Sequence, residues 1–365
     1  MSKRVLILTS EPPERPGGVE HLVRELVMGL ETKGYETEVF HRGNSEPAWL
    51  TKQTGRFGKK LSGTLCGYWV GRNAKKNVTN DVAAIISNSD MGFYPLRHQG
   101  FLKMIHYYHG TYRGQSEAIR PFISRSGYLY LKWWNSMVLE RLSGRGKLIL
   151  ACSDLVREEV ARFFDYESIT MWYPLNTNHF RPRDTLASRH ILGLPKEKTI
   201  GLFVGNSQPT KGIPVVRSLI KALPQVHWVL AIRGDLPESL ADSNLTTLQD
   251  VSHERMPLLY DAADFSLCPS LYESFGYVVA EALACGTPVI ASPGGASRFF
   301  LREPPMDRLL VRKEEAVKGF LDAVHEVLRR PELYRRLVIE HVRPKLEGLM
   351  APENWWRRFF EVTGL

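Results

Sequence analysis

Two glutamates, Glu273 and Glu281, are separated by seven residues and flank the start of a predicted helix over Gly276–Cys285, which lies between two apolar strand-like runs. Eight helical residues at ~1.5 Å rise place the two carboxylates about 12 Å apart. Carboxylate pairs that hydrolyse glycosidic bonds lie roughly 5 to 9.5 Å apart, so this pair is not spaced for acid/base hydrolysis. The spacing instead suits the two ends of an elongated ligand. The amides at the helix start favour a phosphate group between those ends.

Two glycine-containing loops, each between a strand and a helix, add possible phosphate contacts. Gly17 and Gly18 open a predicted helix over Val19–Thr32, where the backbone can approach an anion closely. The second loop runs from Gly205 through Asn206 to Gly212, and Lys211 stands near the start of its helix. A point cation there can neutralise a diphosphate.

His106 and His109 are three residues apart in a predicted strand, so their side chains are expected on opposite faces and make a poor metal pair. His109 ends that strand beside Gly110 and is the better candidate for a site residue. The sequence contains no Asp-X-Asp, the usual carboxylate arrangement for a Mg²⁺ that carries a nucleotide diphosphate. We therefore expect no metal, and expect Lys211, backbone amides and helix dipoles to meet the diphosphate charge.

These residues need a scaffold, and the chain supplies alternating strand and helix patterns that predict an α/β protein with two parallel sheets covered by helices. Two prolines in the segment 172–182 frame a connector at which the second series of strands begins. We expect Rossmann-like domains at 1–176 and 177–351, with a C-terminal helix at 352–365 packing through Trp355 and Trp356. The expected strands are 5–8, 37–40, 83–86, 102–108 and 148–152 in the first domain, and 200–204, 228–232, 265–269, 288–291 and 309–311 in the second.

The 365 residues carry a net charge of +9, concentrated in the first half, where 24 Lys/Arg face 17 Asp/Glu through residue 180. Residues 47–80 hold seven basic side chains and no acidic one (Lys52, Arg56, Lys59, Lys60, Arg72, Lys75 and Lys76). A solvated charge run is one interpretation. An acidic partner, either a phosphorylated acceptor or an anionic membrane surface, is the other.

Several function classes are disfavoured. The sequence has no apolar run long enough to span a membrane and no signal-peptide pattern, so we expect a cytoplasmic protein, with peripheral attachment to the inner face of a membrane left open. The four cysteines lack paired spacing and are expected to be reduced packing residues. The basic runs match no nucleic-acid recognition module, and neither a Gly-X-Ser-X-Gly elbow nor a P-loop is present.

Together these segments resemble the retaining glycosyltransferases of family four, which have the GT-B fold of two Rossmann-like domains facing across a cleft. The resemblance rests on Gly17–Glu20, His109-Gly110, the connector 178–182, the loop 205–212 and the block from Pro269 to Pro288, in this order. It covers nearly the full chain and implies a C-terminal helix that returns to the first domain.

The resemblance implies roles for particular residues. Glu273 would bind donor-sugar hydroxyls, Glu281 the ribose, and Lys211 the diphosphate. His109 would lie beside the anomeric centre, and residues 250–253 would receive the base. The backbone of Ser274, Phe275, Gly276, Tyr277 and Val278 would approach the sugar and diphosphate, with Gly17, Gly18, Gly205 and Asn206 completing the donor site.

Two positions depart from the family pattern. Asn206 stands where relatives commonly have an arginine, which weakens diphosphate neutralisation unless Arg233 or another basic residue compensates. Arg298 stands where relatives often have a glutamate. Neither departure touches Glu273 or Glu281, so we expect an active enzyme.

The expected function is retaining transfer of a hexose from a UDP- or GDP-sugar to a hydroxyl acceptor, in glycan, glycolipid or glycoside synthesis. Catalysis is expected from positioning and charge stabilisation. Two alternatives stay open. One is a GT-B enzyme of another chemistry, such as a nucleotide-sugar epimerase or a phosphorylase, and the other is a sensor that binds the donor without turning it over.

Overall fold

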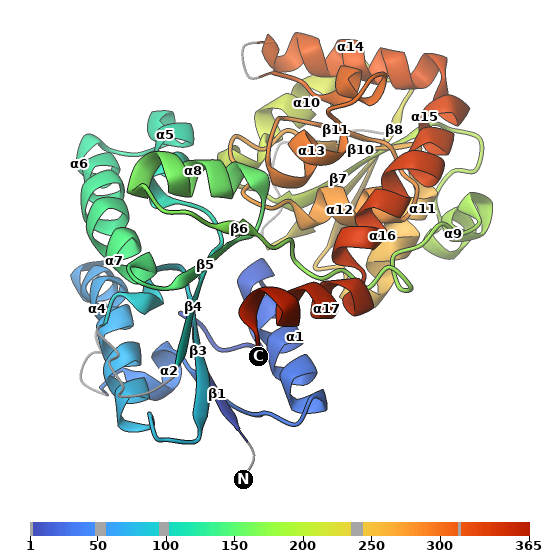
Figure 1. The fold of residues 1–365 in the computed structure, drawn as a ribbon. Helices are drawn as coiled ribbons and strands as arrows, with labels where there is room; N and C mark the ends of the chain where they lie inside the picture. Colours follow the sequence, from blue (N-terminus) through green and yellow to red (C-terminus); the bar gives the residue numbers. More distant parts are fainter. Residues whose placement is uncertain (1–2, 48–55, 95–101, 235–243, 313–314) are drawn as a thin grey trace. The chain divides into compact units, whose positions relative to one another are not determined.

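The computed structural model describes residues 3–47, 56–94, 102–234, 244–312 and 315–365, with only the backbone for 56–64 and Pro209. The chain forms two compact units, Met1–Tyr173 with Trp356–Leu365, and Pro174–Trp355 (Figure 1). Each unit contains one parallel sheet, which confirms the predicted pair of Rossmann-like domains.

The sheet of the first unit has the strand order β2-β1-β3-β4-β5-β6, and every pairing is parallel. All apolar residues of β1 from Val5 to Leu8 are fully buried, as expected for a strand covered on both faces. The order reverses between β1 and β3, and ligands of such sheets bind at the carboxyl ends of the strands beside the reversal. The strands are β1 (Arg4–Leu8), β2 (Glu36–Phe40), β3 (Val82–Asn88), β4 (Lys103–Tyr108), β5 (Leu148–Ala151) and β6 (Ile169–Thr170).

The sheet of the second unit has the order β11-β10-β7-β8-β9, again all parallel. Its reversal lies between β7 and β10, so the loops that follow these two strands are the expected ligand loops of this unit. The strands are β7 (Ile200–Asn206), β8 (His227–Arg233), β9 (Leu245–Gln249), β10 (Phe265–Cys268) and β11 (Val289–Ala291).

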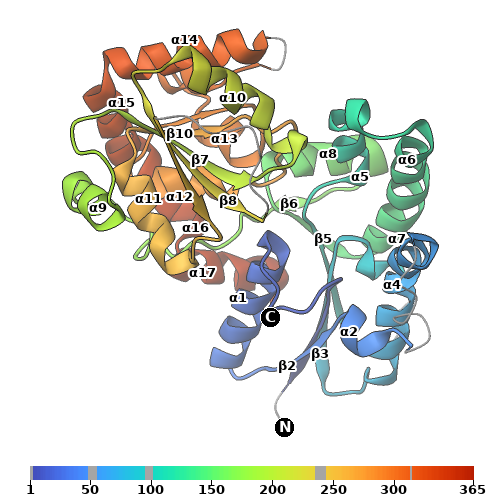
Figure 2. The ribbon, with the colours of Figure 1, turned by 180° about the vertical axis from the view of Figure 1, so that it is seen from behind.

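Helices cover both faces of each sheet (Figures 1 and 2). In the first unit they are α1 (Gly18–Thr32), α2 (Arg42–Ser45), α4 (Arg56–Lys76), η1 (Ser89–Gly92), α5 (Tyr112–Ala118), η2 (Arg120–Phe122), α6 (Arg125–Leu129), η3 (Tyr130–Glu140), α7 (Arg141–Gly144) and α8 (Asp154–Phe164). From Pro174 on they are α9 (Thr185–Leu192), η4 (Pro209–Lys211), α10 (Ile213–Ala222), η5 (His253–Arg255), α11 (Met256–Ala262), α12 (Tyr277–Ala284), α13 (Gly295–Phe300), η6 (Met306–Leu309), α14 (Ala316–Arg329), α15 (Pro331–Leu337), η8 (Val338–Val342), α16 (Arg343–Met350) and α17 (Pro352–Thr363).

The C-terminal helix α17 returns to the first unit, as the family resemblance implied. Its residues from Trp356 on belong to that unit. The indole of Trp356 lies against Gly29 of α1 so closely that a β-carbon at that glycine would stand 1.9 Å from the ring. The Arg358 guanidinium donates to the carbonyl of Thr170, 3.2 Å away. Trp355 is fully buried, so both tryptophans serve packing.

The expected strand 309–311 is wrong. Residues Met306–Leu309 form the 3-10 helix η6, and only a single bridge joins Leu310 to Ala291. Two strands were not predicted. The first, β6, is two residues long, and the second, β9, has the largely polar sequence Leu-Thr-Thr-Leu-Gln of an edge strand.

Two further sequence expectations concern cysteines and membrane spans. All four cysteines are free and buried, which confirms them as packing residues. Among the described residues, no helix has the length and apolarity needed to cross a bilayer.

Candidate active site

An ion pair occupies the reversal point of the second sheet. Lys211, in the loop after β7, lies with its Nζ 2.8 Å from Oε2 of Glu273, in the loop after β10. Both side chains retain access to solvent, with 34% and 24% exposed. Burial by itself lowers the pKa of Lys211, but the charge and hydrogen bond of Glu273 outweigh this and raise the pKa above its usual value. Lys211 is therefore held as a cation at the carboxyl edge of the sheet, beside the reversal point.

The two loops also bind each other through their backbones. The amide of Leu271 donates to the carbonyl of Thr210 at 2.9 Å. Gly212 has a φ of +81°, and a β-carbon there would stand 2.2 Å from the carbonyl oxygen of Pro269, so this close approach requires glycine. The pairing of Lys211 with Glu273 is thus fixed by the loops that carry them.

Glu273 is held from the other side by the start of α13. The amide of Gly295 donates to the carbonyl of Glu273 at 2.8 Å, and the amide of Ala296 donates to that of Phe275 at 2.6 Å. A β-carbon at Gly294 would lie 2.9 Å from the Glu273 β-carbon. Gly276 then turns the chain into α12 with a φ of +93°. This turn brings Ser274, Phe275 and the first residues of α12, Tyr277 and Val278, next to the ion pair.

Glu281 lies one helical turn further along α12 and is partly buried. Its Oε2 accepts a hydrogen bond from the Tyr260 hydroxyl at 2.7 Å. Desolvation raises the pKa of Glu281 to about 7, although the Tyr260 hydroxyl and the positive charge of Arg233 act in the opposite direction. Desolvation makes the ionised form of Glu281 unfavourable. A carboxylate in such surroundings is more typical of a ligand contact than of a stabilising surface charge.

Arg233 is the basic residue expected to compensate for Asn206. The parallel pairing of β7 and β8 places Arg233 directly beside Asn206, at the carboxyl ends of the two strands. Its charge acts on both Lys211 and Glu281. The Asn206 carboxamide instead accepts from the amide of Gln208 at 3.1 Å and shapes the loop. The other departure, Arg298, is exposed on α13.

The loop expected to receive the base lies at the same edge of the second sheet. Asp250 adopts a φ of +47°, and its carboxylate accepts from the amide of Gly234 at 3.1 Å, which joins the ends of β8 and β9. The ring of His253 stacks on that of His179 with centroids 5.3 Å apart.

In the first unit, His109 is held by side chains from two other segments. Its Nε2 lies 2.8 Å from Oδ1 of Asn88, at the end of β3, and its Nδ1 bonds to the hydroxyl of Tyr173. The Asn88 amide donates to the carbonyl of Leu8 at 2.9 Å, which fixes Oδ1 toward the histidine. His109 therefore carries its proton on Nε2 and accepts from Tyr173 at Nδ1. Burial lowers the pKa of its ring to about 3, so the ring stays neutral.

This arrangement predicts a coupling between Asn88 and Tyr173. Asn88→Ala and Tyr173→Phe should each lower the free energy of unfolding by about 1–3 kcal/mol, because each leaves a buried nitrogen of His109 unsatisfied. Their effects should be non-additive in denaturant unfolding, since both act through one ring. Tyr334→Phe, which removes a single hydrogen bond from a buried tyrosine of the second unit, is the matched control and should add to Asn88→Ala. Additivity of Asn88→Ala with Tyr173→Phe would contradict the arrangement.

The remaining predicted residues of the first unit are Gly17 and Gly18, at the start of α1. Gly17 is extended, with a φ of 175°, and no side chain caps the helix. A β-carbon at Gly17 would stand 1.9 Å from a carboxylate oxygen of Glu20, so that carboxylate lies beside the position suggested for a phosphate.

His106 in β4 and His109 just after that strand have separate partners, in agreement with the strand geometry. His106 is fully buried, with its Nδ1 2.9 Å from the Ser87 hydroxyl. Within the described ranges, no group of three His, Cys, Asp or Glu side chains is placed to hold a metal ion.

The fold thus brings Lys211, Glu273 and the start of α12 together in the second unit, with Gly205 and Asn206 on the neighbouring strand. His109, Gly17 and Gly18 belong to the first unit. The sequence interpretation missed Asn88, Tyr173 and Tyr260. Asn88 alone carried a usable signal, because a polar amide directly follows an apolar strand.

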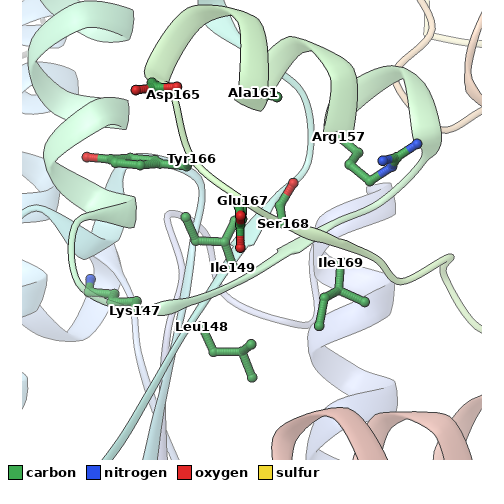
Figure 3. A pocket seen from close by; sticks show the side chains of 10 residues that line it. All are labelled: Lys147, Leu148, Ile149, Arg157, Ala161, Asp165, Tyr166, Glu167, Ser168 and Ile169. Carbon is green, nitrogen blue, oxygen red and sulfur yellow. The ribbon is translucent and has the colours of Figure 1, made fainter.

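An open hollow of about 670 Å³ in the first unit contains none of the predicted site residues. Figure 3 shows its lining side chains around β5, the end of α8 and β6, with Lys147 and Arg157 at opposite sides and Glu167 and Ser168 between them. Its mixed charges define no ligand, so we assign no function to it.

Comparisons with known sequences match both units to glycosyltransferases. Residues 16–175 match the family described as Glycosyltransferase Family 4, and residues 184–341 match the one described as Glycosyl transferases group 1. The D-inositol 3-phosphate glycosyltransferases of Mycobacterium tuberculosis and Mycobacterium bovis are 33% identical over 198 residues. That match covers 50% of this chain and 41% of the relative's length.

Solved structures share the fold over the whole chain. A sucrose-phosphate synthase from Thermosynechococcus elongatus has a TM-score of 0.76 at 20% identity, covering 99% of this chain and 98% of its own. HepE of Anabaena in complex with UDP-glucose has a TM-score of 0.69 at 15% identity, covering 99% of both chains. With the two family matches spanning most of the sequence, the chain belongs to the glycosyltransferases of family four and has their GT-B fold.

Proposed function

We propose that the protein is a retaining glycosyltransferase that moves a hexose from a nucleoside-diphosphate sugar to a hydroxyl acceptor. The observation that carries this proposal is the Lys211–Glu273 pair at the reversal point of the second sheet, with Glu281 one turn into the helix that starts beside it. A cation paired with one carboxylate, with a second carboxylate one turn into the adjoining helix, suits a ligand that has a sugar, a diphosphate and a ribose in series.

In the proposed complex, Glu273 accepts hydrogen bonds from sugar hydroxyls and Glu281 accepts them from the ribose. Lys211 neutralises the diphosphate, and Arg233 supplies a second positive charge within reach of the same carboxylates and lysine. Arg233 takes the place of the family arginine that Asn206 replaces, and together with Lys211 it makes a divalent metal unnecessary for charge balance. The backbone from Ser274 to Val278 lies where the sugar and diphosphate pass. The structure of HepE was solved with UDP-glucose, and its fold matches this chain over 99% of the residues.

The proposed transfer breaks the bond between the anomeric carbon and the diphosphate oxygen and forms a bond from that carbon to the acceptor oxygen on the same face. The acceptor proton passes to the departing phosphate, so no protein base is required. His109 is unsuited to such a role, because Nε2 carries its proton, the lone pair of Nδ1 accepts from Tyr173, and burial lowers the pKa of the ring to about 3. We assign the histidine to holding the end of β4 in place.

The acceptor is proposed to bind the first unit, whose sequence carries most of the net positive charge. The mycobacterial relatives are named for an inositol phosphate acceptor, which is anionic. An anionic or lipid-linked hydroxyl acceptor is therefore the class we propose.

The test is a titration of the purified protein with UDP-, GDP-, ADP- and TDP-sugars, with and without EDTA, followed by transfer to a panel of hydroxyl acceptors. We expect one base to bind in preference to the others, with no loss in EDTA, and a product of retained anomeric configuration by NMR. Binding without transfer to any acceptor would favour the sensor. Release of an epimerised sugar or a sugar phosphate would favour the other chemistries, and an inverted product would contradict the retaining mechanism.

A further inference from the structure

A helical segment of the first unit exposes large apolar side chains along one side. It comprises α6, η3 and α7, which follow one another without a break from Arg125 to Gly144. Trp133 and Trp134 are 58% and 44% exposed, Leu129 and Tyr130 lie four residues before them, and Leu142 lies eight residues after Trp134. The wider turn of the π-helix η3 keeps a repeat of four on one side. Single exposed apolar residues are ordinary, but a row of them on one helix marks an interaction surface.

The opposite side of the same segment is fixed to the body of the unit. Asn135, Ser136, Leu139 and Glu140 are buried. The carboxylate of Glu140 accepts the amide of Tyr112 at 3.0 Å. The tryptophans therefore cannot turn inward without breaking these contacts. Figures 1 and 2 show the helix labelled α6 and α7 along the outer side of the unit, on the face of the sheet opposite α1.

The charged side chains within this segment, apart from one buried glutamate, have one sign. Between Arg120 and Arg145 the chain carries five basic residues, Arg120, Arg125, Lys132, Arg141 and Arg145, and a single acidic one, the buried Glu140. The Lys132 ammonium lies 3.1 Å from the hydroxyl of Tyr128, and Arg120 lies over that ring at 5.2 Å. Basic heads thus flank the apolar row, with no exposed carboxylate in the segment to neutralise them.

We propose that this aromatic–basic stripe (the apolar residues Leu129, Tyr130, Trp133, Trp134 and Leu142 with the five basic residues) docks the protein on an anionic lipid bilayer. A helix with its apolar side in the interface and its basic residues at the headgroups is the arrangement of interfacial membrane helices. Tryptophan and tyrosine favour the headgroup level, and Lys or Arg residues near an anionic leaflet add attraction that salt screens. Docking here goes beyond the transfer reaction, because it needs neither donor nor acceptor.

The experiment is co-sedimentation of the full chain with vesicles of phosphatidylcholine alone or with phosphatidylglycerol, at low and high salt. We expect binding to the anionic vesicles that falls at high salt. Trp133→Ala with Trp134→Ala should weaken it at least about tenfold, and so should Arg125→Gln with Arg141→Gln and Arg145→Gln, which leaves the apolar row intact.

Matched controls come from α9 and from exposed arginines of the second unit. Leu186 and Ile191 are as exposed as the tryptophans, at 56% and 58%, so Leu186→Ala with Ile191→Ala should leave vesicle binding unchanged. The triple variant Arg302→Gln with Arg329→Gln and Arg330→Gln removes as much positive charge as the triple arginine variant of the stripe. It too should leave vesicle binding unchanged. Circular dichroism verifies folding of each variant. Failure of the wild-type protein to bind anionic vesicles would overturn the proposal, as would equal binding by the tryptophan variant. If the wild-type protein fails to bind, an acidic protein becomes the favoured partner of the stripe.

Discussion

Replacing Lys211 with alanine is expected to lower kcat by about 10²–10³-fold while leaving the fold intact. Mutagenesis of a preorganised donor aimed at developing charge typically costs that much in kcat. As a stabilising contact the same ion pair is worth only about 0–1 kcal/mol, because 34% of Lys211 and 24% of Glu273 remain exposed. The lysine should therefore matter far more for turnover than for stability. Steady-state kinetics and thermal unfolding of the same preparation measure both effects.

A second ion pair in the same unit provides the control. Nζ of Lys345 lies 2.7 Å from Oε2 of Glu303, nearly the same separation as between Lys211 and Glu273, but on an exposed surface. Lys345→Ala should leave kcat unchanged and affect unfolding as little as Lys211→Ala does. Glu273→Gln should reduce turnover sharply without a large change in unfolding temperature. If Lys211→Ala and Lys345→Ala reduced kcat equally, the diphosphate role of Lys211 would be wrong.

The fold could be predicted from the sequence because the buried strands have a recognisable pattern. Runs such as Val5–Leu8 are apolar without interruption, as strands of a parallel sheet covered on both faces must be. Edge strands lack this signal. The polar β9 and the two-residue β6 went unrecognised, and an apolar run at 309–311 was mistaken for a strand although it forms only one bridge.

The site was predictable to the extent that it depends on local chain geometry. Glu273 and Gly276 stand on the loop before α12 and Glu281 on the helix itself, so one short stretch of sequence already groups them. Contacts between distant segments carry no such signal. Tyr260 reaches Glu281 from α11, and Tyr173 reaches His109 from the connector, 64 residues later in the chain. The environment of a side chain, and with it the pKa, follows from these distant contacts and could not be inferred beforehand.

The shifted pKa of Glu281 leads to an expected dependence of donor affinity on pH. A carboxylate accepts both ribose hydroxyls only when ionised, and desolvation raises the pKa of Glu281 to about 7. Raising the pH from 6 to 8 should then tighten nucleotide binding about tenfold, the change in the ionised fraction across that pKa. Titration calorimetry at both values measures it. Glu281→Gln should bind the nucleotide weakly at both pH values. A tenfold rise in the affinity of this variant between pH 6 and pH 8 would mean that another group titrates.

Ionisation of Glu281, which is expected to favour nucleotide binding, should reduce the stability of the fold. Because the folded pKa of about 7 lies above the ordinary 4.5, the unfolded chain loses its proton first, and folding becomes less favourable as the pH rises from about 4.5 to 7. The full shift corresponds to about 3 kcal/mol. Glu281→Gln removes the buried charge, so it should match the wild-type protein at pH 4 and exceed it in free energy of unfolding at pH 8.

Glu326 is the matched control, because it too accepts a tyrosine hydroxyl, that of Tyr334 at 3.0 Å. Desolvation raises the pKa of Glu326, but the Tyr334 hydrogen bond and the charges of Arg308 and Arg330 lower it below the usual value overall. Its ionised form therefore stabilises the fold above about pH 4.5, and Glu326→Gln should reduce stability at pH 8. A gain in the free energy of unfolding at pH 8 in Glu281→Gln, with a loss in Glu326→Gln, would indicate that Glu281 is retained for the ligand at the expense of stability. A loss of stability in both variants would contradict that conclusion.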